Sequence, residues 1–187
     1  MHGVQQWVAI GIAGGAIVWL ILAYNSLVAL RVRTQNAWAQ VDVQLKRRHD
    51  LIPNLVETAR GYMQHERSTL EAVTQARTNA VAAASGPLPQ RVVAESVLTG
   101  ALGKFFAVAE NYPQLRASEN MQLLQEELTS TENRIATARQ FYNDETMRYN
   151  TAQAIFPRSL MARPFGFSPA TMFAADEADR ANVQVKF

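Results

Sequence analysis

The stretch that decides the fold lies near the N-terminus, where residues 4–24 read VQQWVAIGIAGGAIVWLILAY. Apart from Gln5 and Gln6 the run is almost entirely apolar, and no charged side chain occurs from residue 3 to residue 30. A bilayer core about 30 Å thick needs roughly 20 such residues as a helix, because lipid cannot pair with an open backbone group. The stretch therefore predicts a membrane-spanning helix.

The helical pattern continues beyond this span without a glycine or proline until Pro53. Apolar residues between positions 37 and 59 recur at intervals of three and four, which is typical of an amphipathic helix. We therefore expect one helix to leave the membrane and become the first helix of a soluble bundle. Pro53 predicts a kink in it rather than an end, since the apolar pattern resumes at once, through Met63 and Leu70 to the alanines at 80–84.

Two further long helices follow the turn at residues 85–89, which reads SGPLP. The first is expected at about 90–111, antiparallel to its predecessor because the turn is short. The second is expected from the N-cap Ser118 to about Phe156, where apolar residues recur every seven positions. Seven residues are the predicted seam of the bundle: Leu98, Leu102, Phe105, Leu128, Ile135, Tyr142 and Tyr149.

These elements predict an all-α protein with one transmembrane helix that continues into a long antiparallel, coiled-coil-like bundle of about three to four helices. The expected divisions are an anchor at 1–30, the bundle at 31–168, and a short helix and tail at 169–187. The short helix is expected from Pro169 to about residue 178, with Ser168 as its N-cap.

Charge next to the span predicts its orientation. Arg31 and Arg33 are the first charges after it, and an excess of positive charge marks the cytoplasmic end of a membrane helix. Both arginines are also close enough to contact lipid headgroups. A cleaved signal peptide is the alternative, but it would carry a basic residue before the apolar run, which this chain lacks. We expect an uncleaved anchor with its N-terminus outside the cytoplasm.

Within the span, Gly11 and Gly15 lie four residues apart, so they share one face of the helix. Small residues at this spacing let two helices approach closely in lipid, although glycine is also common in membrane helices that do not associate. The pair is a candidate site of transmembrane self-association.

The soluble part offers little for catalysis. The chain has no cysteine, and His49 and His65 are sixteen residues apart, which favours surface histidines over a metal site. The acids of the last long helix, such as Glu126, Glu132 and Glu145 with their neighbours, are interpreted as a solvated face. No metal, cofactor or catalytic residue is therefore predicted.

Two asparagines beside the predicted seam have a different interpretation. Asn143 and Asn150 are seven residues apart, and each directly follows a seam tyrosine. Amides at such positions often fix the register of packed helices through hydrogen bonds across the seam. We expect this structural role for both residues in preference to ligand binding.

Several stretches resemble the LemA family of bacterial membrane-anchored proteins. They are YNSLV at 24–28, NAWAQVDVQLKRR at 36–48, DLIPNLVET at 50–58, ARQFYN at 138–143, YN at 149–150, FP at 156–157 and FGF at 165–167. The resemblance implies a single N-terminal anchor in the bacterial inner membrane and a cytoplasmic helical bundle. It implies no catalytic residue. Some relatives belong to magnetosome membranes and are linked to membrane shaping.

Two functional hypotheses follow. The first is a non-enzymatic membrane scaffold that forms a homo-oligomer larger than a dimer and organises or shapes a bacterial membrane. The second is a membrane-tethered adaptor or regulator of a membrane enzyme such as a protease. Membrane lipids are expected partners in both cases. Nucleic acid is not, because residues 91–150 carry slightly more acid than base.

Overall fold

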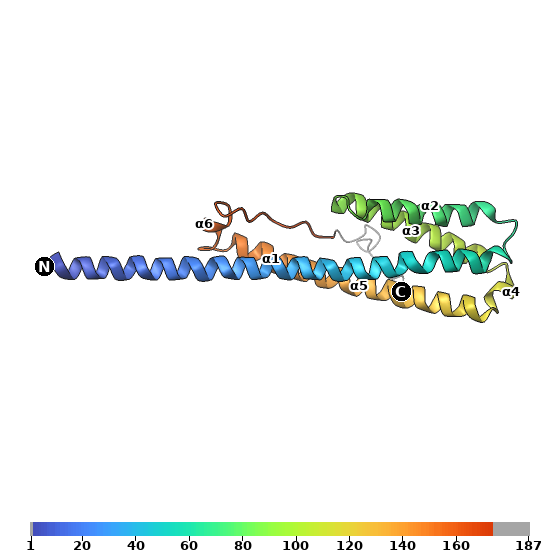
Figure 1. Cartoon of the computed structure of the whole chain (residues 1–187), viewed down its shortest axis with the longest axis horizontal. Coiled ribbons are helices and arrows are strands. Elements are labelled where there is room, and N and C mark those ends of the chain that lie inside the picture. Colours follow the sequence, from blue (N-terminus) through green and yellow to red (C-terminus); the bar gives the residue numbers. More distant parts are fainter. Residues whose placement is uncertain (1, 174–187) are drawn as a thin grey trace, which may run out of the picture. The chain divides into compact units, whose positions relative to one another are not determined.

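The computed structural model describes residues 2–173, which form six helices and, within that range, no strand (Figure 1). The helices are α1 (His2–Arg60), α2 (Arg67–Ala83), α3 (Leu88–Ala109), α4 (Pro113–Arg116), α5 (Glu119–Ala154) and α6 (Ser159–Ala162). The predicted all-α class is confirmed.

The chain divides into two compact units. The central unit holds residues 40–139, and the terminal unit holds the described residues up to 39 together with those from 140 onward. The division lies inside both α1 and α5, and within the stretch that we expected to be one bundle at 31–168.

The central unit is a helical bundle made of the last part of α1, then α2, α3, and the first part of α5. Short connections make successive long helices antiparallel. Its core combines buried side chains from all four segments, among them Leu55, Val73, Phe105 and Leu128. The helices are thus held by a shared apolar interior, which each can bury only against the others.

The first helix ends earlier than we expected. The chain leaves α1 at Arg60 and forms turns at 61–66, where the amide of Tyr62 donates to the carbonyl of Ala59 (3.0 Å) and that of Glu66 to the carbonyl of Met63 (3.0 Å). Gly61 stands at this point, and glycine weakens a helix by about 1 kcal/mol relative to alanine. Met63 is nevertheless buried, so the apolar spacing predicted its burial correctly but not its helix.

Pro53 lies inside α1, which continues through it. A proline cannot donate to the carbonyl four residues earlier, which here belongs to His49. Arg77 of α2 supplies the missing donor, since its Nε lies 2.7 Å from the His49 carbonyl oxygen. The hydrogen bond that the proline removes from α1 is thereby replaced by one between helices.

The two later long helices lie close to their expected positions. Both ends of α3 lie two residues earlier than the predicted 90–111. α5 lies within the predicted 118–156. All seven predicted seam residues are buried. The four-residue helices α4 and α6 were not predicted, because elements this short carry no periodic signal.

The terminal unit has a separate, smaller core. Every side chain of α1 from residue 3 to residue 22 is exposed, and burial begins at Ala23. Beyond that point the unit buries Leu27, Tyr149, Ala152, Ala162 and Phe167 in one cluster. Residues 169–173 are not helical, in contrast to our expectation of a helix at 169–178. The rest of that predicted helix and the tail lie outside the described residues.

Candidate functional site

A buried charge cluster links three helices of the central unit. Arg48 of α1 is only 1% exposed, and its Nη2 donates to Oε2 of the buried Glu95 on α3. Its Nη1 lies 2.7 Å from Oε2 of Glu132 on α5 and 3.1 Å from Oγ1 of Thr99. The other carboxylate oxygen of Glu95 lies 2.9 Å from Nε2 of His49.

Glu95 is therefore the centre of this cluster. Burial raises the pKa of its carboxyl, but the hydrogen bond to His49 and the charge of Arg48 outweigh burial, so that the pKa of Glu95 lies below its ordinary value. A carboxylate held ionised in this way is a weak base and a strong structural partner. The arrangement fixes helices to one another and offers no evident proton-transfer step.

Three of our expectations for the polar residues need correction here. His49 is buried and bonded to Glu95, whereas we expected a surface histidine; His65 is exposed as expected. Glu132 is bonded to Arg48 and Glu145 is buried, so neither belongs to a fully solvated face. Burial at such positions cannot be recognised from one helix alone, because it depends on how other segments pack against that helix.

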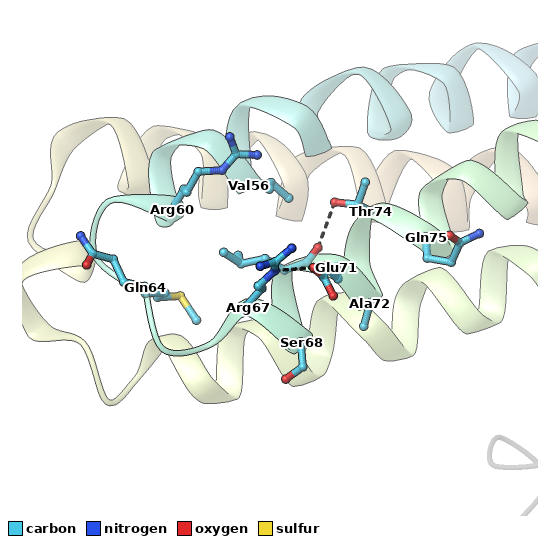
Figure 2. A pocket seen from close by; sticks show the side chains of 11 residues that line it. Val56, Arg60, Gln64, Arg67, Ser68, Glu71, Ala72, Thr74 and Gln75 are labelled. Atoms are coloured by element: carbon cyan, nitrogen blue, oxygen red, sulfur yellow. Dashed lines mark hydrogen bonds and ion pairs between the residues drawn. The ribbon is translucent and has the colours of Figure 1, made fainter.

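Several hollows adjoin the central unit, and two of them are lined by three or more charged side chains. The larger has a volume of about 940 Å³ and lies between the end of α1 and α2 (Figure 2). Its charged lining residues are Arg60, Arg67 and Glu71, of which the last two form an ion pair at 2.7 Å. That pair is well exposed, so it makes a poor centre for acid–base chemistry.

The second hollow, of about 400 Å³, lies beside the charge cluster. Most of the charged groups that line it have partners there: Arg91 pairs with Asp42, and Lys46 with Asp50 at 2.5 Å. Within residues 2–173 no group of three histidine, aspartate or glutamate side chains is arranged to hold a metal ion.

Asn143 and Asn150 bind an extended segment in the terminal unit. The Nδ2 of Asn150 donates to the carbonyl of Ala170 (2.9 Å), and the amide of Ala170 donates back to its Oδ1 (2.9 Å). Asn143 forms the same pair of bonds with Phe173, at 3.2 and 2.8 Å. We call these four bonds the asparagine clasp.

The geometry of the asparagine clasp follows from the rise per residue of a helix and of an extended chain. Seven residues of helix rise about 10.5 Å, and three residues of extended chain span about 10 Å, so both amides meet the segment in register. The ring of Phe173 stacks on Trp38 (5.5 Å between centroids) and meets the edge of Tyr142 (5.4 Å). Tyr142 also donates its hydroxyl to the carbonyl of Thr171 (2.7 Å).

The partner of the two asparagines thus differs from our expectation, which was another helix. Their spacing identified them from the sequence as paired structural amides. The segment that they bind has no periodicity of its own, so nothing in the sequence indicated where it would lie.

We expect removal of the asparagine clasp to release this segment. Asn143→Ala with Asn150→Ala should increase hydrogen exchange at the amides of Ala170 and Phe173 by more than tenfold, since those amides lose their acceptors. Mass spectrometry of peptides that cover 168–173 measures the rate. Asn133→Ala, at an exposed position of α5, is the matched control and should leave it unchanged. Equal protection in both variants would contradict the assignment.

The apolar span is the other candidate site. The described part of α1 contains an 18-residue window near the N-terminus that is apolar enough to cross a membrane, and only 6% of that window is buried. Leu88–Ala109 passes the same test of length and composition, but this helix is α3, which buries Leu98, Leu102 and Phe105 in the central unit. A Cβ atom added at Gly11 or Gly15 would have no atom within 4 Å apart from the glycine's chain neighbours and the helix's own backbone. Arg31 and Arg33 are exposed beyond the span.

Comparison with known proteins places these features in context. The model of the LemA family matches residues 37–187. Magnetosome protein MamQ 1 of Paramagnetospirillum magneticum is 26% identical in an alignment 181 positions long, and the match covers 84% of this chain and 66% of that protein. Protein LemA of Metamycoplasma hominis is 26% identical over 162 residues, which cover 85% and 72%. The chain thus spans just under two thirds of the length of the magnetosome relative.

Proposed function

The chain belongs to the LemA family, and from this premise we propose that it is a non-enzymatic, membrane-anchored scaffold that self-associates and organises or shapes a bacterial membrane. The observation that carries the proposal is the exposure of residues 3–22, an apolar stretch of α1 that has no cover within the described chain. So large an apolar surface requires a bilayer or a partner helix, since leaving it in water is unfavourable in proportion to its area.

Self-association is supported by the same helix. Gly11 and Gly15 carry no side chain and lie four residues apart on the exposed span, a spacing that allows close packing of identical helices. Confinement to a bilayer raises the local concentration of subunits, so that weak contacts suffice. Identical subunits that pack head to tail close into rings or extend into arrays. A scaffold larger than a dimer is therefore the assembly that we propose.

Membrane shaping is supported by the relatives. Magnetosome proteins are among the sequences similar to this chain. The link of such proteins to membrane shaping is what the family resemblance implies. The polar clusters of the central unit support a non-enzymatic role, because the charges of Arg48, Glu95 and Glu132 are committed to one another.

We expect Gly11→Ile with Gly15→Ile to shift the protein to smaller particles. The branched side chains would hold the helices apart, while the bundle keeps its circular dichroism spectrum because neither residue contacts it. Light scattering of detergent-extracted protein measures the particle mass. Ile10→Ala with Ile17→Ala, elsewhere on the span, is the control. An unchanged mass in the glycine variant would remove this face from the interface.

The proposed orientation has the soluble units in the cytoplasm, and it is testable because the chain has no natural cysteine. Gly3→Cys should react with an impermeant thiol reagent on intact cells, whereas Thr137→Cys, which is exposed on α5, should react only after lysis. Labelling of position 137 on intact cells would reverse the orientation.

A further inference from the structure

A second apolar surface lies around α6. Within residues 155–165 four large apolar side chains are exposed: Ile155 (57%), Phe156 (74%), Leu160 (68%) and Phe165 (56%). Single exposed apolar residues are ordinary on proteins, but several in one short segment mark an interaction site. In the same segment Met161 and Ala162 are buried, so one side of α6 is fixed to the terminal unit while the other presents the apolar side chains.

The depth of this surface is set by its contact with α1. The ring of Tyr24 meets the edge of Phe165 (5.5 Å between centroids) and that of Phe167 (5.6 Å). Tyr24 directly follows Ala23, the first buried residue of α1. The roughly 20 residues before that point have the length of a bilayer core, and tyrosine is favoured where a helix emerges from it. The α6 segment therefore lies at the level of the lipid headgroups.

The charge of the segment suits that position. Residues 146–173 contain no aspartate or glutamate, and they include Arg158 and Arg163 beside the apolar side chains. Arg31 and Arg33 add positive charge on α1 just beyond the span. Basic residues interleaved with exposed aromatic and aliphatic side chains favour an anionic bilayer surface, where both kinds of group are satisfied at once.

We propose that residues 155–165 form a second membrane-contact surface, which enters the headgroup region of the leaflet from which α1 emerges. Phe156, Leu160 and Phe165 reach the boundary of the acyl chains, and Arg158 and Arg163 pair with lipid phosphates. A single span leaves the part of the protein outside the bilayer free to tilt against the membrane surface. The second contact limits that tilt for the terminal unit. This inference rests on the proposed anchor and adds the lipid surface that the soluble part contacts.

A second copy of the chain is the competing occupant of this surface. The bilayer is favoured because the surface is continuous with the membrane span through Tyr24, and because the segment offers basic groups without acidic ones for a symmetric pairing. The two occupants differ in what they place next to Leu160: lipid in one case and protein in the other.

The test uses a fluorophore sensitive to polarity in the full-length chain, attached through Leu160→Cys. The protein is reconstituted in nanodiscs of phosphatidylethanolamine and phosphatidylglycerol, with lipids that carry a quencher near the headgroup. We expect blue-shifted emission and quenching at least threefold stronger than for Phe141→Cys, which is also exposed (43%) but lies on α5 next to Tyr142, whose ring meets Trp38 of α1, fourteen residues beyond Tyr24. Quenching should weaken when phosphatidylcholine replaces the anionic lipid.

The other outcomes overturn the inference in distinguishable ways. Water-like emission without quenching at position 160 would exclude membrane contact, and blue-shifted emission without quenching would assign the surface to a second protein. Quenching that does not depend on lipid charge would remove the preference of this surface for an anionic headgroup. A probe attached through Ile12→Cys reports on the span itself. Quenching at position 12 without quenching at position 160 would support the membrane anchor and exclude only the second contact. No quenching at either position would overturn the anchor as well.

Discussion

Glu95→Ala is expected to lower the free energy of unfolding by about 3–5 kcal/mol, because it leaves Arg48 buried without its main counter-ion. Arg48 keeps a bond to Glu132, but that residue is half-exposed and its attraction is correspondingly weaker. His49 loses its acceptor in the same variant. Urea unfolding followed by circular dichroism, in one mild detergent for all variants, measures the change.

Glu126→Ala is the matched control, since Glu126 is an exposed acid on α5. It should change the free energy of unfolding by less than about 0.5 kcal/mol. Because the pKa of Glu95 is lowered in the folded protein, its stabilising contribution is complete above the ordinary carboxyl range and is lost as the pH falls through the lowered pKa. Glu95→Ala should therefore lose stability less steeply than the wild type in acid. Equal effects of the two substitutions would show that the charge cluster is not structural.

Ile135→Ala is the second substitution with a large expected effect, about 2–5 kcal/mol of unfolding free energy. Ile135 is fully buried on α5, and truncation would leave a cavity that its neighbours can fill only in part. Leu123→Ala removes a similar side chain from an exposed position (54%) of the same helix and should cost little. The same unfolding measurement applies. Similar losses of unfolding free energy for both variants would mean that Ile135 does not lie on the buried face of α5.

The long helices could be predicted from the sequence because their stability depends on a repeating apolar face. Ile135 and Tyr142 belong to a series of apolar residues that recur every seven positions along α5. Both ends of this helix lie within two residues of the expected positions. The end of α1 at Arg60 was not predicted, because Val56, Met63 and Leu70 keep one spacing although they belong to a helix, a turn and another helix. The spacing of apolar residues indicates which side chains are buried, whereas a turn is indicated only by residues that break the helical backbone.

The polar features depended on contacts between distant segments. Arg48 and His49 are consecutive on α1, and nothing in their own helix indicates that Glu95, on α3, lies between them. The asparagine clasp is an intermediate case. The spacing of Asn143 and Asn150 identified a pair of structural amides, but the extended segment that they bind becomes visible only once the chain has turned back after α6.

The mass of the assembled protein shows whether the chain is a self-associating membrane scaffold. Multi-angle light scattering of the wild type is measured in several mild detergents and in nanodiscs formed directly from native membranes. We expect one mass larger than that of a dimer in all of them, and a smaller mass for the variant with Gly11→Ile and Gly15→Ile. A monomer of 20.8 kDa in every condition would contradict the scaffold and favour a membrane-tethered adaptor.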